Sequence, residues 1–164
     1  YNVQNIALSG AIARRLGLSM VEIAAGVGLL QPFEKKLQLI PGEQIVIDDT
    51  LNDNPLATAE ALSVLSEFPG RRIVVTSGLT TEDGKQDEIN YAFGTQMKGC
   101  ADAVILIGNR HTVRPLVRGI LSTGFPKGAV HLVKDLDDAA DLLSEIAGAG
   151  DTVLYEGEAR EVEE

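Results

Sequence analysis

The stretch Ile45–Pro55, IVIDDTLNDNP, decides how the rest of the chain can be interpreted. Three β-branched residues run straight into two carboxylates, and a short polar segment then leads to a proline. Asn54 is a favoured helix N-cap, and Pro55 suits the first helical position. The stretch therefore predicts a buried strand, a polar turn at its carboxyl end and a helix that follows at once.

The same alternation of strand and helix continues to the end of the chain. Strands buried on both faces have continuous apolar runs, which occur at residues 45–47, 73–75, 103–107, 130–133 and 153–155. Segments with helical spacing separate them, at about residues 55–68, 85–98, 113–122 and 136–147. Short links between such elements predict an α/β fold with a doubly wound, mostly parallel sheet. Ligands of these sheets bind beyond the carboxyl ends of the strands.

The aliphatic residues of these runs are the predicted core of the sheet. We expect them all to be nearly buried, because burying each large aliphatic side chain contributes about 1.5–3 kcal/mol. They are Ile45, Ile47, Val74, Val75, Val104, Leu106, Val130, Leu132 and Leu154.

Two helices are predicted before the first strand, over about residues 3–16 and 19–31. Ser19 and Glu22 form a capping box at the start of the second helix, and Pro32 ends it. The apolar residues of this helix fall on one face. They are Met20, Ile23, Ala24, Val27 and Leu30. We expect this half-covered pair of helices to pack on another surface.

Composition and charge exclude several classes of protein. The 164 residues are 45% hydrophobic and 4% aromatic, enough for one packed domain with an aliphatic core. The formal net charge of −10 repels nucleic acid and anionic lipid, so we expect neither as a partner. No apolar run reaches the length of about 18 residues that a membrane span needs.

The remaining composition bears on compartment and metal binding. Cys100 is the single cysteine, so no internal disulfide can form, and a reducing cytosol is compatible. Two histidines with one cysteine argue against a zinc site, and no segment resembles a signal peptide. We expect a cytoplasmic monomer with no metal ligands of its own. Because the first residue is Tyr1 and not Met, we also expect the chain to be a piece of a longer protein.

The acidic pair Asp48 and Asp49 is the first candidate site, because it follows a strand at the mouth of the sheet. A carboxylate there can accept hydrogen bonds from sugar hydroxyls, and the helix that begins after Asn54 offers free N–H groups to an anion. The alternative is that these residues only cap the turn and the helix.

The loop from Gly78 to Gln86 nearly matches a phosphate-binding P-loop. Five residues separate its glycines where the P-loop has four, and Gln86 stands where Ser or Thr would hold magnesium. We therefore expect no P-loop here.

Other charged residues are interpreted as solvated. His111 follows a strand without a partner nucleophile, and the acidic residues 156–164 are expected to form a solvated end. Arg110, Arg114 and Arg118 share one helix stripe. We interpret this stripe as a solvated face, with contact to an anionic ligand or partner as the alternative.

Two functions remain open on these residues alone. A signalling receiver domain would use the acidic pair, Thr76 and Lys134. It also needs a phospho-accepting Asp at the end of its central strand, where this chain has Gly108 and Asn109. The other function is a nucleotide-handling domain that lacks its own phosphate loop and needs a partner domain.

Four segments, in order along the chain, resemble the Mur ligase family. NVQN at residues 2–5 is similar to the N-V-x-N that opens the last helix of the family's central domain. FEKKLQLI at 33–40 is similar to the hinge E-H-R-L-Q-L-I. IDDTLNDNP at 47–55 is similar to I-D-D-S/T-Y-N-A-N-P in members that add D-alanyl-D-alanine to the muramoyl tripeptide. RRIVVT and the residues that follow, 71–94, resemble R-R-I-L-V-T-P-G-M-x-E-L-G.

The resemblance implies the C-terminal, Rossmann-like domain of an ATP-dependent amide ligase of peptidoglycan precursor synthesis. In this family the central domain binds ATP and Mg²⁺ and activates a carboxylate as an acyl phosphate, which an amine then attacks. The C-terminal domain closes over ATP and places the amine, here a D-alanyl-D-alanine-like substrate. Residues 1–35 would be the last helices of the central domain and the hinge, 36–157 the C-terminal domain, and 158–164 an acidic tail.

The resemblance also implies partners and roles for single residues. The full enzyme would bind nucleotide and a UDP-muramoyl-peptide, whereas this chain alone would be inactive. By position, Asn2 and Asn5 would face the adenine, Asp49 would bind the ribose hydroxyls, and Lys36 would lie beside the phosphates. The implied contacts to the substrate are Asn52, Asn54, Thr76 and Thr81.

Several positions depart from the family pattern. Lys36 replaces the usual Arg, which keeps the charge but loses the bidentate fork. Leu51 replaces the usual Tyr, Ser77 replaces Pro, and residues 81–83 replace the E-L-G pattern. Residues 156–164 lack the usual closing motif. A non-catalytic or differently specific Mur-like protein is therefore the alternative function.

Overall fold

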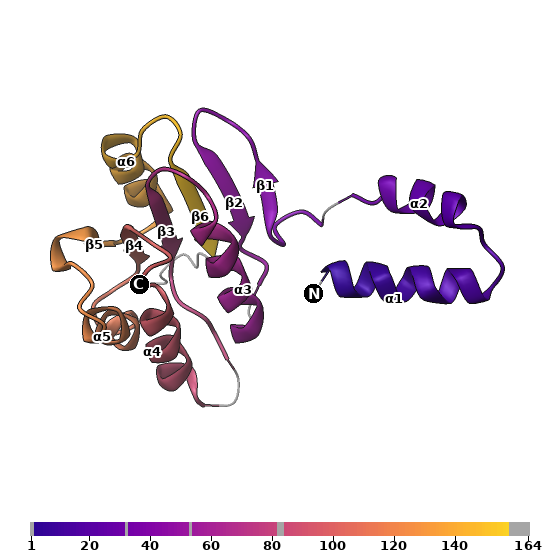
Figure 1. The fold of residues 1–164 in the computed structure, drawn as a ribbon. Coiled ribbons are helices and arrows are strands. Elements are labelled where there is room, and N and C mark those ends of the chain that lie inside the picture. The colour runs from indigo at the N-terminus through magenta and orange to yellow at the C-terminus, as the bar shows by residue number, and fades with distance from the viewer. Residues whose placement is uncertain (1, 32, 53, 82–83, 158–164) are drawn as a thin grey trace. The chain divides into compact units, whose positions relative to one another are not determined.

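The computed structural model describes residues 2–31, 33–52, 54–81 and 84–157. The chain divides into two compact units, Tyr1–Pro32 and Phe33–Glu164. Figure 1 shows a pair of helices in the first unit and a sheet with flanking helices in the second.

The first unit is a helical hairpin, residues 2–31, in which α1 (Asn2–Arg15) and α2 (Met20–Gly28) lie side by side. The predicted capping box is confirmed: Ser19 Oγ accepts from the Glu22 N–H at 3.2 Å, and the Ser19 N–H donates to Glu22 Oε2 at 2.8 Å. None of the residues of α2 is buried. The helices therefore form from local signals, without an apolar core of their own.

Within the described residues, one six-stranded sheet organises the second unit, in the order β1-β2-β6-β3-β4-β5. All its pairs are parallel except β1 with β2, so the mostly parallel sheet is confirmed. The strands are β1 (Gln38–Ile40), β2 (Ile45–Asp49), β3 (Arg72–Thr76), β4 (Ala103–Ile107), β5 (Val130–Val133) and β6 (Thr152–Glu156). Sequence reasoning missed β1, because a three-residue strand at the sheet edge has no buried run to mark it.

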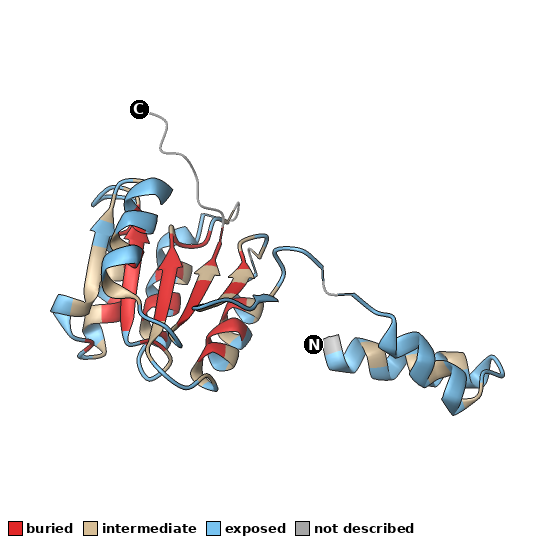
Figure 2. Ribbon diagram, turned by 90° about the horizontal axis from the view of Figure 1, so that it is seen from above, coloured by how far each residue is buried: buried red, intermediate tan, exposed pale blue. Residues whose placement is uncertain are grey.

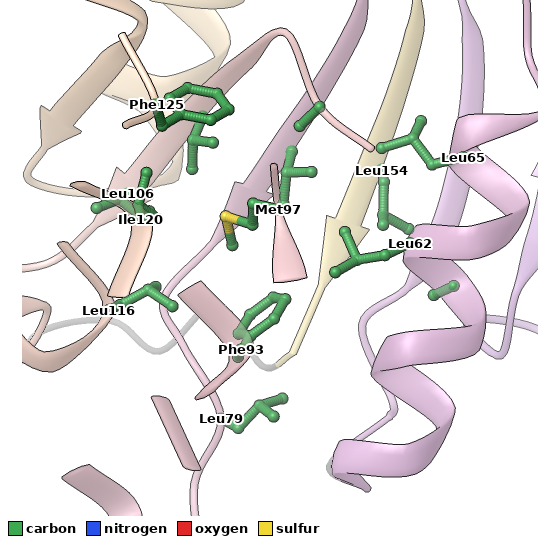
Figure 3. Packing of buried hydrophobic residues seen from close by; sticks show 14 of the residues in the cluster. Leu62, Leu65, Leu79, Phe93, Met97, Leu106, Leu116, Ile120, Phe125 and Leu154 are labelled. Carbon is green, nitrogen blue, oxygen red and sulfur yellow. The ribbon is translucent and has the colours of Figure 1, made fainter. Parts of the chain in front are cut away.

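The predicted helices of the second unit are present on both faces of the sheet. Helices α3, α4 and α5 pack on one face, around the cluster shown in Figure 3, and α6 packs on the other. Their bounds are α3 (Pro55–Ser66), α4 (Gln86–Gln96), α5 (Arg114–Ser122) and α6 (Leu136–Ile146), and a short 3₁₀ helix, η1 (Lys127–Ala129), precedes β5. The doubly wound arrangement is therefore confirmed.

Helices α4 and α5 approach each other through glycines. A Cβ at Gly94 would collide with the Leu116 carbonyl, and one at Gly119 would collide with the Tyr91 carbonyl. Because both obstacles are main-chain atoms, no side chain could move aside to make room. The two glycines therefore fix the spacing of this helix pair.

The predicted core is confirmed for six residues and wrong for three. Ile47, Val74, Val75, Val104, Leu106 and Leu154 are all buried. Ile45 and Val130 are only half-buried, and Leu132 is 43% exposed. Strand β5, which carries Val130 and Leu132, is one of the two outer strands of the sheet, as Figure 2 shows, and Ile45 begins its strand at the amino end. Sequence runs reveal which segments are apolar but not which strand lies at the edge.

Candidate functional site

Three polar residues end three neighbouring strands at the carboxyl edge of the sheet. Asp49 of β2 is the register partner of Glu156 of β6, and Glu156 is the partner of Thr76 of β3. Because side chains alternate along a strand, they share the face of Ile47 and Leu154, which α3 covers. Their exposed fractions are 4%, 0% and 2%. A row of buried polar groups therefore lies along the carboxyl ends of three neighbouring strands.

Asp49 ties this row to the chain segment before β1. Its Oδ1 accepts the Leu37 N–H at 2.7 Å, and its Oδ2 accepts from Asn52 Nδ2 at 2.9 Å. A carboxylate offers about four lone-pair sites, so each oxygen retains capacity for a further donor. Asp48, its half-buried neighbour, accepts from the Thr50 N–H and hydroxyl.

Glu156 ties the same row to the start of α3. Its Oε1 accepts from the Thr58 hydroxyl at 2.6 Å and from Asn52 Nδ2 at 3.1 Å. Its Oε2 is buried with no hydrogen-bond partner. An ionised carboxylate in this position would leave a charged oxygen unsatisfied, at a cost of several kcal/mol.

The electrostatics of the pair follow from this burial. Burial raises the pKa of Glu156 to about 8, and the nearby Asp49 charge adds to the rise. Burial also raises the pKa of Asp49, whereas hydrogen bonds from the Leu37 N–H and Asn52 lower it. The raised pKa therefore favours the protonated form of Glu156 at neutral pH, and the hydrogen bonds from the Leu37 N–H and Asn52 favour the ionised form of Asp49.

The expectation that residue 156 belongs to a solvated acidic end is wrong. Glu156 is the last residue of β6 and is completely buried, while residues 158–164 lie outside the described residues. Sequence reasoning could have found it, because Glu156 follows a buried run directly, as Asp48 and Asp49 do. Thr58 was also missed, since a threonine in the first turn of a helix has no distinctive pattern.

Lys36 lies in a strained turn next to this cluster. The residues on either side of it, Lys35 (φ 58°) and Leu37 (φ 52°), both adopt left-handed backbone conformations. Such a conformation costs about 1–2 kcal/mol for a residue other than glycine. The Leu37 N–H is held by Asp49, and the Lys35 carbonyl accepts the Leu51 N–H at 3.0 Å. The turn therefore depends on β2 for its shape, and it leaves the Lys36 side chain exposed.

Two of the predicted substrate contacts have internal roles. Asn52 donates to both carboxyl groups, and its Oδ1 accepts the Asn54 N–H at 3.0 Å. Asn54 is exposed and is the predicted N-cap of α3, with its Oδ1 accepting the Leu56 N–H at 3.0 Å. The polar turn and the helix start predicted from IVIDDTLNDNP are both present.

The other two predicted contacts lie after β3. The buried Thr76 accepts the Gly78 N–H on its hydroxyl oxygen at 2.9 Å, and Thr81 is half-buried. Asn90 of α4 holds the loop between them, because its Oδ1 accepts the Leu79 N–H and its Nδ2 donates to the Leu79 carbonyl, both at 2.8 Å. Gly78 has φ +88°, and a side chain there would collide with Asn90.

Asn2 and Asn5, the predicted adenine contacts, lie on α1 in the helical hairpin. Asn5 is exposed and lines an apolar cavity of about 330 Å³ between α1 and α2. The other six predicted site residues belong to the second unit.

The basic residues are solvated, as the sequence interpretation expects, but the shared helix stripe is wrong for Arg110, which lies in a turn before α5 begins at Arg114. Arg110, His111, Arg114 and Arg118 are all solvent-accessible. The Arg118 guanidinium lies 5.9 Å from the centre of the Tyr91 ring, within cation–π range. Two shallow cavities of about 310 and 290 Å³ flank this contact, and the exposed Asp87 lines both.

Within the part of the chain that the structure describes, no three His, Cys, Asp or Glu residues lie close enough together to hold a metal ion. The helices of that part are also too short or too polar to cross a membrane.

Comparisons with known proteins agree with this architecture. The family model described as "Mur ligase, glutamate ligase domain" matches residues 36–159. Among curated proteins, UDP-N-acetylmuramoyl-tripeptide–D-alanyl-D-alanine ligase of Escherichia coli K12 is 25% identical over 113 residues. This alignment covers 67% of the chain but 25% of the relative, so the chain spans about a quarter of that protein.

Solved structures share the fold. MurF from Acinetobacter baumannii aligns with a TM-score of 0.79 and 20% identity, over 98% of this chain and 35% of that one. MurF ligase from Thermotoga maritima, solved in complex with ADP, has a TM-score of 0.75 and 20% identity over 96% of this chain and 34% of that one. A bifunctional folylpolyglutamate synthase/dihydrofolate synthase from Yersinia pestis has a TM-score of 0.63 and 17% identity, over 86% and 32%.

Proposed function

The chain belongs to the Mur ligase family through its glutamate ligase domain, and we propose that it is the C-terminal part of an ATP-dependent amide ligase in peptidoglycan precursor synthesis. Residues 36–157 would close over ATP and place an amine like D-alanyl-D-alanine. Residues 1–35 would be the last helices of the central domain and the hinge. Since ATP and UDP-linked precursors are cytoplasmic, we place the enzyme in that compartment.

The proposal rests chiefly on the connection between the strained turn and the carboxyl end of β2. The Asp49–Leu37 hydrogen bond holds the turn at the edge where parallel sheets bind ligands. The exposed Lys36 ammonium at its centre suits the phosphates of a nucleotide, because a cation next to a phosphate forms a strong, charge-assisted hydrogen bond. A merely solvated lysine would not need two left-handed residues to present it.

We propose that Lys36 and Asp49, both in the second unit, form one wall of an ATP site. Lys36 would contact the phosphates, the remaining lone pairs of Asp49 would accept the ribose hydroxyls, and Asn2 and Asn5 would face the adenine. ATP supplies the phosphoryl group that activates the carboxyl substrate. Mg²⁺ would be held mainly by the P-loop of the central domain.

The predicted substrate contacts divide into two kinds. Asn52 uses both amide hydrogens inside the protein, and Thr76 is buried at the end of β3, so we propose that they support the site. Asn54 and Thr81 are more accessible, and we propose that these two touch the amine substrate.

A ligation assay on the full-length protein tests the proposal. The protein is incubated with ATP, Mg²⁺, the UDP-muramoyl tripeptide and D-alanyl-D-alanine, and phosphate release and product mass are measured. We expect a UDP-muramoyl pentapeptide and one phosphate per ligation. Turnover only with a different amine would favour the differently specific alternative. No ATP-dependent ligation with any amine would favour the non-catalytic one.

Lys36 provides the residue-level test in the same assay. A charge-assisted hydrogen bond contributes about 1.5–3 kcal/mol, so Lys36→Ala should lower kcat/KM for ATP roughly tenfold to a hundredfold. Lys36→Arg should retain activity, because it keeps the charge. Lys127→Ala, which removes an exposed lysine of η1, is the matched control and should have no effect. Equal activity of Lys36→Ala and the wild type would exclude a phosphate contact.

The chain alone should be inactive, because one wall of a site leaves most of the nucleotide in water. We expect ATP to bind the isolated chain with a Kd of about 1 mM or weaker. Titration should shift amide signals near Asp49 and Asn54 slightly, without saturation. ATP hydrolysis by the purified chain that survives removal of contaminants would contradict this expectation.

A further inference from the structure

Asp49 and Glu156 form a pair of buried carboxyl groups across neighbouring strands. They are register partners at the ends of β2 and β6, and the Asn52 side chain donates to both of them. Among the described residues, no ion pair or hydrogen bond joins either carboxyl group to a basic side chain. Two adjacent negative charges without a counter-ion are strongly unfavourable in a buried site, so the pair retains one proton at neutral pH.

The hydrogen bonds determine which member carries the proton. Asp49 accepts a main-chain N–H at 2.7 Å and an amide N–H at 2.9 Å, on different oxygens, and both bonds stabilise its ionised form. Glu156 accepts its two hydrogen bonds on Oε1 alone, which leaves Oε2 free to be the O–H of a carboxylic acid. The proton therefore belongs on Glu156 and the charge on Asp49.

The charge on Asp49 holds the turn around Lys36. The Leu37 N–H donates to Asp49 Oδ1 while Leu37 is in a left-handed conformation. A hydrogen bond to a charged acceptor contributes about 1.5–3 kcal/mol, which is enough to offset the backbone strain of one such residue. Loss or displacement of the Asp49 carboxylate would let the turn relax.

We infer that Glu156 is a positioning residue: as the protonated member of the pair it lets Asp49 stay ionised in place, and Asp49 thereby holds the turn that presents Lys36. The link from Glu156 to the turn stands on the geometry alone, whereas the effect on ATP rests on the proposed function. Glu156 itself is fully buried, so it acts through Asp49 and not on a ligand.

Few other groups can titrate against this pair. Asp48, on the same strand, adds negative charge near Asp49, and Tyr155 lies on the opposite face of β6 with its pKa raised by burial and by Asp48. The polar groups contributed by α3 and β3 are Thr58 and Thr76, which do not titrate near neutral pH. A transition between pH 7 and 9 at this edge of the sheet would therefore report Glu156, whose pKa is about 8.

NMR titration of the 164-residue chain tests the link directly. The Glu156 carboxyl carbon, the Leu37 amide and the Asn52 side-chain amide are followed from pH 5.5 to 9.5. In the wild type, all three should shift with a common midpoint near pH 8. In Glu156→Gln, which mimics the neutral acid, the Leu37 amide should keep its low-pH position throughout. Glu145→Gln, the same change on the exposed face of α6, should titrate as the wild type does.

Two results would overturn the inference. One is a midpoint of the Glu156 carboxyl carbon below about pH 6, which would make Glu156 an ordinary carboxylate. The other is a Leu37 amide that does not follow the Glu156 transition in the wild type, or that still follows it in Glu156→Gln. Both wild-type measurements remain decisive if the variant fails to fold.

Kinetics of the full-length protein test the consequence for ATP. Between pH 7 and 9 the KM for ATP of the wild type and of the control Glu145→Gln should rise about tenfold, equivalent to the loss of one charge-assisted hydrogen bond. In Glu156→Gln the KM for ATP should change less than about twofold over the same pH range. An equal rise of this KM in the wild type, Glu145→Gln and Glu156→Gln would contradict the link from Glu156 to Lys36, even if the ligase is active. If no ATP-dependent activity exists, the proposed function fails, and the NMR titration still decides the role of Glu156.

Discussion

The helical hairpin and the sheet unit are built from similar apolar residues, but the sheet unit buries them and the hairpin leaves them exposed or half-buried. Every residue of β4 (AVILI) is buried, whereas no residue of α2 (MVEIAAGVG) is. Figure 2 shows this contrast, with buried strands in the sheet unit and exposed or half-buried helices in the hairpin. Capping and periodicity are enough to form a helix, but a core needs side chains from several segments. The family match begins at residue 36, so the hairpin also lies outside the matched domain.

The largest difference should appear when buried and edge leucines are truncated. Leu106→Ala removes a completely buried side chain from β4 and should lower the free energy of unfolding by about 2–5 kcal/mol. Leu132→Ala, on the neighbouring edge strand β5, should cost less than about 1 kcal/mol, because Leu132 is 43% exposed. Chemical denaturation of both variants checks the pair. Equal losses would mean that β5 is not an edge in solution.

The carboxyl pair should make the sheet unit less stable as the pH rises, a dependence that the hairpin lacks. The pKa of Glu156 is raised from 4.5 to about 8 by folding. Between these values the folded state binds one more proton at Glu156 than the unfolded state does. The contribution of Glu156 to stability is therefore greatest below pH 4.5 and falls as the pH rises towards 8. We expect this contribution to decline by about 1.4 kcal/mol per pH unit.

Glu156→Gln should remove this slope, since glutamine does not titrate. Denaturation should therefore give nearly equal free energies of unfolding for the two proteins at pH 5. At pH 6.5 and again at pH 8, the free energy of unfolding of the variant should increase relative to that of the wild type. A constant difference between the two proteins across this range would place the Glu156 pKa near its ordinary value.

A smaller effect is expected where glycines set the spacing of helices. Gly119→Ala would press a Cβ into the Tyr91 carbonyl, and such overpacking costs about 1–3 kcal/mol, more than the gain of about 1 kcal/mol in helix propensity. Gly26→Ala in α2 is the matched change in the hairpin, where a Cβ would meet open space. It should raise the helical content slightly. Thermal unfolding followed by circular dichroism measures both, and a stabilised Gly119→Ala would show that α4 and α5 can separate.

The smallest effect is expected on the exposed face of the hairpin. Val21→Ser alters a residue that is 79% exposed, so the unfolding free energy should change by less than about 0.5 kcal/mol. The same substitution at the buried Val104 should cost several times more, because it places a hydroxyl in the core. A large loss at Val21 would indicate that this face of α2 is covered in the folded protein.

Local sequence patterns predicted the elements that carry the candidate site, but not the hydrogen bonds that join them. IVIDDTLNDNP correctly predicted a strand, a polar turn and the Asn54 cap, because each depends on neighbours within a few residues. The internal bonding of Asn52 and the strain at Lys35 and Leu37 left no such signal. These features arise only when β2, the turn and β6 meet, and the predicted contacts to ATP and substrate remain predictions.

The sequence by itself determined the order of elements, the capping of α2 and α3 and the apolar composition of the strands, since these follow from short-range sterics, hydrogen bonding and periodicity. Only the tertiary structure decided the order of strands in the sheet. By inserting β6 between β2 and β3, it brings Glu156 to Asn52, 104 residues away in the chain, and to Thr58. Burial at that junction raises the pKa of a glutamate that was expected in solvent to about 8.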